Sequence, residues 1–208
     1  DPVVLMTFAN SAGLSVLTPY FMTPTQRELV THYTQIAAAS DLPVILYTNP
    51  GRTQVHLDVE TVLELADVDT IIGIKDSSGD ADLLARYLAE RPDGFAVLVG
   101  RDTLILEGLR GGADGAIAST ANIAPALVAG IYDAFTAGDL ERAERLQAAL
   151  SPLRSVVDRA TFPVILKEGL RLAGIDAGVP LAPARDLSDD VADELALVVS
   201  AALRATES

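Results

Sequence analysis

Short, continuous apolar runs alternate with longer stretches of helical period over the first two thirds of the chain. The runs cover residues 3–6, 14–18, 44–47, 71–75, 96–100 and 116–118. Their apolar residues are consecutive rather than alternating with polar ones, which is typical of parallel strands covered on both faces. Because helical segments separate the runs, the pattern predicts an α/β fold of right-handed βα units.

Residues that favour helix starts stand between these runs. Thr23, followed by Pro24 and by Gln26, predicts a helix that continues to about Ser40. Further helices are expected over residues 58–66, 80–88 and 102–109, each capped by its first Asp.

After residue 122 only helical patterns remain. They cover residues 124–137, 140–157, 163–173 and 188–205. In the last of them Val191, Leu195, Val198 and Ala202 fall on one face and predict a packing stripe. We therefore expect a barrel or open sheet followed by a helical appendage.

The composition excludes several classes of function. The 208 residues include 29 acidic and 15 basic ones, a net charge of −14, which argues against a nucleic acid or an anionic membrane as the partner. Without cysteine there is no disulfide, thiol nucleophile or thiolate metal site, and His32 and His56 are too far apart in sequence for metal-ligand spacing. No apolar run is long enough to span a bilayer, and residues 1–6 lack the basic region of a signal peptide, so a cytoplasmic protein is expected.

Lysine usage points to one position. Of the 15 basic residues only Lys75 and Lys167 are lysine. Lys75 closes the apolar run 71–75, and the active sites of α/β barrels lie at the carboxyl ends of their strands. Partial desolvation there favours the uncharged, nucleophilic amine, although the acidic chain opposes this. The alternative is that the ammonium group of Lys75 simply extends into solvent. Lys167 lies on a predicted helix and is expected to be structural.

Tyr47 closes the run 44–47, one βα unit before Lys75. Side chains that end neighbouring parallel strands converge on one mouth, so Tyr47 and Lys75 are candidates to share a substrate. A buried core tyrosine is the alternative.

Several segments, in this order, resemble the dihydrodipicolinate synthase / N-acetylneuraminate lyase family. The resemblance covers nearly the whole chain from about Ser11. The segments are Leu17–Phe21, Tyr47–Thr53, Gly73–Asp80, Gly112–Ile117 with Ala121, Asn122 and Pro125, and Phe162–Val164 with Lys167.

The resemblance implies a TIM (β/α)8 barrel with a C-terminal helical extension, here residues 1–137 and 138–208. It implies a class I aldolase that joins pyruvate, or a similar keto acid, to an aldehyde without a metal or other cofactor. A homo-oligomer, either a dimer or a tetramer, is also expected.

By matching motifs, the resemblance gives Lys75 the Schiff-base position and Tyr47 the proton-relay position. Arg52 matches the arginine that contacts the carboxylate of the second substrate in the synthase branch. The carbonyl of Ile117 matches a backbone acceptor that faces the site. A protonated imine on Lys75 is an electron sink, which lets the pyruvate methyl group lose a proton and attack the aldehyde.

The sequence departs from the family pattern at three points. A complete barrel takes about 250 residues, and the family's Gly-Thr-Thr-Gly-Glu loop is not found, so we expect a fragment or processed form without the first strands. Phe21 stands where the synthase branch has a tyrosine that reaches across the dimer interface to complete the relay. Ser119 and Asp102 match lyase-branch residues that face a polyhydroxylated substrate.

The leading interpretation is a dihydrodipicolinate synthase-like enzyme. A sugar-acid aldolase or dehydratase, of the 2-keto-3-deoxy acid or N-acetylneuraminate type, is the alternative favoured by Phe21, Ser119 and Asp102. A non-catalytic barrel that binds a keto acid is a third possibility, which Lys75, Tyr47 and Arg52 argue against because a binder needs no nucleophilic amine.

Overall fold

The computed structural model describes residues 12–206, so the predicted strand at 3–6 lies outside the described residues. The chain divides into two compact units. One comprises the described residues up to Arg101 together with Arg110–Ala116, and the other comprises Asp102–Leu109 and the described residues from Ile117 onward. The predicted domain boundary at 137/138 is based on family resemblance rather than on packing, and it stays a prediction.

The first unit is built on a parallel sheet whose strands follow one another in chain order. Each strand lies within about two residues of its predicted apolar run, so the α/β prediction is confirmed for the described part of the chain. The strands are β1 (Leu14–Leu17), β2 (Val44–Thr48), β3 (Ile71–Asp76), β4 (Ala96–Val99) and β5 (Gly115–Ala116).

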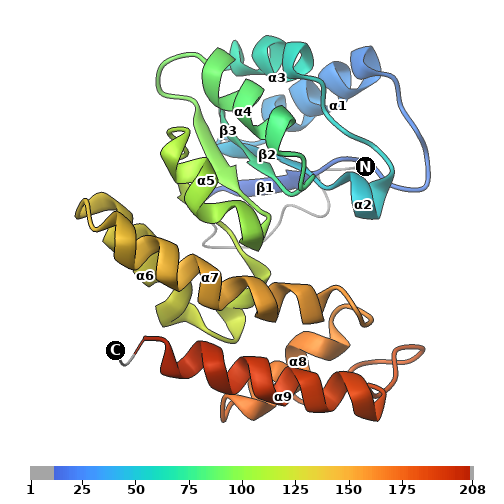
Figure 1. Ribbon diagram of the computed structural model, residues 1–208. Helices are drawn as coiled ribbons and strands as arrows, with labels where there is room; N and C mark the ends of the chain where they lie inside the picture. The colour runs from blue at the N-terminus through green and yellow to red at the C-terminus, as the bar shows by residue number, and fades with distance from the viewer. Residues whose placement is uncertain (1–11, 207–208) are drawn as a thin grey trace. The chain divides into compact units, whose positions relative to one another are not determined.

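Three helices, α1 (Gln26–Ala38), α3 (Val59–Ala66) and α4 (Ala81–Glu90), lie together on one side of this sheet (Figure 1). Leu46, Ile74 and Val97 are neighbours in register on β2, β3 and β4, and all three are fully buried. Because successive strand residues point to opposite faces, the adjacent row, which contains Tyr47 and Lys75, faces away from this core and is only half-buried.

The start of α1 differs from its prediction. The N-cap is Thr25 and not Thr23, because Thr25 has a glutamate three residues later. The Thr25 hydroxyl accepts the Glu28 N–H at 3.3 Å, and the Glu28 carboxylate accepts the Thr25 N–H at 2.8 Å. This reciprocal pair satisfies two backbone N–H groups at once. Gln26, three residues after Thr23, is engaged elsewhere, because its side-chain amide donates to the His56 carbonyl oxygen and accepts the Asp58 N–H, each at 3.1 Å.

Two other predicted caps have different outcomes. The prediction for Asp80 is confirmed, since its carboxylate accepts the Leu83 N–H at 3.0 Å at the start of α4. The prediction for Asp102 is wrong, because residues Asp102–Leu104 form a short 3-10 turn before α5 (Ile105–Arg110), and the carboxylate binds groups from another segment.

The second unit is helical after a 3-10 turn at Ser119–Asn122, as predicted. Its long helices are α6 (Pro125–Thr136), α7 (Leu140–Val157), α8 (Val164–Leu172) and α9 (Asp189–Arg204). Helix α7 packs against α6 and α9, and α8 packs against α9 (Figure 1). The buried stripe of α9 contains Val199 rather than the predicted Val198. Among the described residues, no helix combines the length and apolar character needed to cross a membrane.

Gly100, which follows β4, packs so closely against the end of β3 that no side chain fits at its position. An ideal Cβ at this position would lie 1.9 Å from Ser77 Oγ and 2.8 Å from the Asp76 carbonyl oxygen. We expect Gly100→Ala to lower the free energy of unfolding by about 2 kcal/mol, because the backbone of β3 must shift to admit the methyl group. Urea denaturation measures this.

Gly51→Ala is the matched control. A Cβ at Gly51 meets only Asn49 Oδ1, at 3.8 Å, which is an ordinary contact. Equal stability changes for the two variants would contradict the assignment of close packing to Gly100.

Candidate active site

Tyr47 and Lys75 are brought together as predicted. They are direct neighbours in the parallel register of β2 and β3, near the carboxyl ends of both strands. The Lys75 ammonium nitrogen lies 4.1 Å from the centroid of the Tyr47 ring. The site therefore places an amine and a phenol on one face of the sheet, and both side chains are half-buried.

The phenolic oxygen of Tyr47 receives hydrogen bonds from its surroundings. The Asn49 side-chain amide donates to it at 3.1 Å. Burial, the largest single influence, acts to raise the pKa of Tyr47, but the Asn49 hydrogen bond, the positive charge of Lys75 and the Ser77 hydroxyl together outweigh it. The pKa of Tyr47 is consequently lower than that of an ordinary tyrosine.

Asn49 and Ser77 are site residues that the sequence analysis did not identify. Each lies just past the end of its strand, two residues after Tyr47 and after Lys75 respectively. That equal offset is the signal that was available in the sequence, since neighbouring parallel strands end at the same edge. The contact of Asn49 with the phenol depends on the turn that follows β2, which the apolar pattern does not encode.

Arg52 lies on α2 (Pro50–Thr53), a single turn that follows β2 directly and was not predicted. Its backbone N–H donates to the Asn49 carbonyl oxygen at 2.9 Å, and its side chain is exposed. The turn is anchored beneath by a hydrogen bond of 2.9 Å between the buried hydroxyls of Thr53 and Thr18. Arg52 thus stands on a fixed support close in sequence to Tyr47.

Ile117, Ser119 and Asp102 belong to the second unit, whereas Tyr47, Lys75 and Arg52 belong to the first. Ile117 follows β5 directly and is 44% exposed. The predicted part of its carbonyl group in substrate binding stays a prediction.

Asp102 and Ser119 lie side by side in a buried polar cluster. The Asp102 side chain is fully buried, and one of its oxygens accepts both the backbone N–H of Thr120, at 2.8 Å, and the Thr120 hydroxyl. Its other oxygen accepts the Ser119 hydroxyl at 3.4 Å and lies 3.6 Å from Arg154 Nε. Arg154 also donates to Ser119 Oγ at 3.0 Å. The carboxylate therefore joins the segment after β5 to α7.

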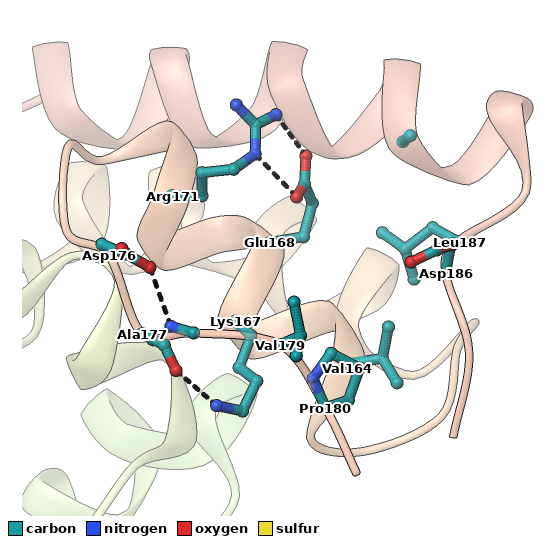
Figure 2. Close-up of a pocket in the computed structure, with 12 residues that line it drawn as sticks. Val164, Lys167, Glu168, Arg171, Asp176, Ala177, Val179, Pro180, Asp186 and Leu187 are labelled. Carbon is teal, nitrogen blue, oxygen red and sulfur yellow. Dashed lines mark hydrogen bonds and ion pairs between the residues drawn. The ribbon is translucent and has the colours of Figure 1, made fainter. Parts of the chain in front are cut away.

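Lys167 lines a cavity of about 660 Å³ between α8, the segment after it and α9 (Figure 2). Its ammonium group donates to the carbonyl oxygen of Ala177, as the dashed line in Figure 2 marks. Arg171, one helical turn further along, pairs with Glu168 through two contacts of 2.9 and 2.5 Å. Lys167 thus connects α8 to the segment that follows it, consistent with the structural role expected for it.

The sequence comparisons match the description reached from these residues. The model of the dihydrodipicolinate synthetase family matches residues 7–202. The 4-hydroxy-tetrahydrodipicolinate synthase of Methanopyrus kandleri is 38% identical over 200 residues, which are 94% of this chain and 66% of that protein. An uncharacterized DapA-like lyase of Halobacterium salinarum is 38% identical over 178 residues, 86% of this chain and 58% of that one. The chain thus spans 66% and 58% of the length of these two relatives, less than two thirds of each.

Solved structures match equally well. The crystal structure of dihydrodipicolinate synthase DapA-2 from Bacillus anthracis superposes with a TM-score of 0.88 at 29% identity, covering 92% of this chain and 65% of that one. Dihydrodipicolinate synthase from Thermotoga maritima gives a TM-score of 0.88 at 29% identity, with 93% and 67% covered. The predicted fold class, a portion of a (β/α)8 barrel with C-terminal helices, is confirmed.

The buried cluster around Asp102 predicts a stability effect. Asp102→Ala is expected to lower the free energy of unfolding by about 3 kcal/mol, because Arg154 and the Thr120 N–H lose a buried partner. Asp158→Ala removes an exposed partner of Arg154, which lies at 2.5 Å, and should cost less than about 1 kcal/mol. Urea denaturation of both variants checks this, and an equal small loss would show that Asp102 does not hold the unit together.

Proposed function

Because the chain belongs to the dihydrodipicolinate synthetase family, we propose that the protein joins pyruvate to an aldehyde through an imine on Lys75. The observation that carries this proposal is the Lys75 amine, 4.1 Å from the Tyr47 ring centroid at the carboxyl ends of β2 and β3. A half-buried amine beside a phenol combines a nucleophile with a proton donor, which imine formation requires.

In this mechanism the Lys75 nitrogen attacks the keto carbon of pyruvate, and the carbinolamine oxygen leaves as water after it takes a proton from Tyr47. The resulting iminium draws electrons from the adjacent methyl group, whose proton returns to Tyr47. The enamine carbon then bonds to the aldehyde carbon, and the aldehyde oxygen takes the proton held by Tyr47. Water finally hydrolyses the iminium that this leaves, which releases the product and restores the Lys75 amine. The steps need only the amine, the phenol, water and an oriented second substrate.

Arg52 supports a second substrate that carries a carboxylate, as in the synthase branch of the family. A planar guanidinium can hold a carboxylate through two parallel hydrogen bonds. Arg52 stands five residues beyond Tyr47 on α2 and has an exposed side chain. We therefore assign it the carboxylate distal to the reacting carbonyl, and the function becomes dihydrodipicolinate synthase-like.

The contacts of Asp102 and Ser119 weigh against the sugar-acid alternative. A residue that recognises a polyhydroxylated substrate must offer free acceptors, whereas the Asp102 carboxylate is fully buried and bonded to Thr120 and Ser119. We propose that this pair holds the second unit together.

An exposed apolar segment supports the expected homo-oligomer. Tyr20, Phe21 and Met22, which follow β1, are 74%, 99% and 69% exposed. Contiguous apolar side chains of this size mark interaction sites more often than free surface. We propose that this segment contacts a second copy of the protein, as the resemblance implies for Phe21.

The assignment of Lys75 predicts the site of covalent trapping. Incubation of the intact protein with pyruvate and borohydride should fix one adduct, on the peptide that contains Lys75, as measured by mass spectrometry. Lys167→Arg should label as the original protein does, because Lys167 is engaged with the Ala177 carbonyl group. An adduct on Lys167, or none on either lysine, would contradict the mechanism.

The assignment of Arg52 predicts a selective loss. Arg52→Ala should leave trapping at Lys75 nearly unchanged, because pyruvate does not need the clamp. It should lower kcat/KM for a carboxylate-bearing aldehyde by about 2 kcal/mol, roughly thirtyfold, the size expected when one partner of a substrate ion pair is removed. An aldehyde without a carboxylate is the control, and an equal loss with it would make Arg52 structural and favour a sugar-acid substrate.

A further inference from the structure

We propose that Asn49 is a positioning residue for proton transfer at Tyr47: its side-chain amide donates to the phenolic oxygen and stabilises that oxygen when it carries negative charge. This inference rests on the proposed function. It concerns a residue to which the family resemblance assigns no role. An amide N–H can only donate, so the phenol accepts from Asn49 and its own proton stays available to the substrate.

The backbone of Asn49 is held independently of its side chain. Its carbonyl oxygen accepts the N–H groups of Arg52, at 2.9 Å, and of Thr53, at 3.1 Å, and the Thr53 hydroxyl at 3.2 Å. The Thr53 hydroxyl is in turn bonded to Thr18 at the end of β1. The backbone of Asn49 is therefore tied to the ends of two strands, so a change of its side chain leaves these backbone contacts in place.

The side chain is used in an unusual way for its place in the chain. Asparagine before a helix commonly caps the first turn with its side-chain oxygen. Asn49 precedes α2, yet its side chain makes no capping hydrogen bond and instead reaches Tyr47 Oη at 3.1 Å. The Asn49 side chain thus contacts the phenol of Tyr47 instead of the backbone N–H groups at the start of α2.

The charge that this contact stabilises arises during the reaction. When Tyr47 gives its proton to the departing oxygen of the carbinolamine, the phenol becomes a phenolate until it takes a proton from the methyl carbon of the iminium. The Asn49 N–H then donates to a negatively charged oxygen, while the cationic iminium nitrogen of Lys75 lies over the same ring. Hydrogen bonds to a charged group are stronger than those to a neutral one, so the interaction is largest at this stage.

The groups around Tyr47 agree with this assignment. Lys75 on β3 supplies the positive charge, Ser77 a hydroxyl, and Leu17, the neighbour on β1, no titratable group. Asp76 points to the opposite face of β3, where its side chain is 2% exposed. Because the pKa of Tyr47 lies below its ordinary value despite burial, removing the Asn49 donor should raise it.

Titration of Tyr47 in the intact protein without substrate tests the inference. Tyrosinate ultraviolet absorbance, with Tyr47→Phe subtracted, reports the phenol alone. We expect Asn49→Leu to raise the pKa of Tyr47 by about one unit and to lower kcat about tenfold with a nearly unchanged KM for pyruvate. Gln54→Ala is the matched control, because Gln54 is an amide after the same turn that donates to the Pro50 carbonyl group at 3.3 Å. It should leave the titration unchanged.

Asn49→Asp has the same shape as the original residue and serves if Asn49→Leu does not fold. Its carboxylate only accepts and adds negative charge, so the pKa of Tyr47 should rise further. An unchanged or lower pKa in either folded variant, or an equal shift in Gln54→Ala, would overturn the inference. The titration needs no substrate, so its failure is distinguishable from a failure to trap pyruvate on Lys75.

Discussion

The pairing of β2 with β3 is the constraint on which the candidate active site depends. It places Tyr47 opposite Lys75 on one face, while Leu46 and Ile74 lie opposite each other on the other face and are fully buried. A slip of one residue would turn Lys75 toward the buried face and expose the apolar pair. The hydrophobic core therefore fixes the distance between amine and phenol, and the chemistry needs no separate device to hold the two strands in register.

The charge beside Tyr47 on this face of the sheet is positive, although the chain as a whole is acidic. Acidic residues outnumber basic ones by 29 to 15, yet the charged side chain that lies over the Tyr47 ring is a lysine. The adjacent acid, Asp76, is buried on the opposite face, and burial raises the pKa of its carboxyl group even though it accepts the Ser78 N–H at 2.9 Å. Because successive strand residues point to opposite faces, the Asp76 carboxyl group and the Lys75 cation lie on different sides of the sheet. The phenol of Tyr47 lies on the side of the cation.

Residues whose environment is set by local periodicity could be predicted from the sequence. The apolar runs give the strand ends at which Tyr47 and Lys75 lie, and the helices after residue 122 follow from their apolar spacing. Asp102 could not be interpreted in this way, because its partners Thr120 and Arg154 are 18 and 52 positions away along the chain and meet it only after folding. The contact of Asn49 with Tyr47 depends similarly on the turn of α2, and a capping residue such as Thr25 depends on which glutamate reaches it.

The glycines at β3 and β4 have a consequence for how this protein can change over generations. A Cβ on Gly73 would lie 2.5 Å from the Ala96 carbonyl oxygen, and one on Gly100 would overlap Ser77 Oγ. Neither codon can acquire a side chain without moving the strand that carries Lys75. Substitutions accumulated over generations are therefore expected at exposed side chains beyond the strand ends, such as Arg52, rather than at these two glycines.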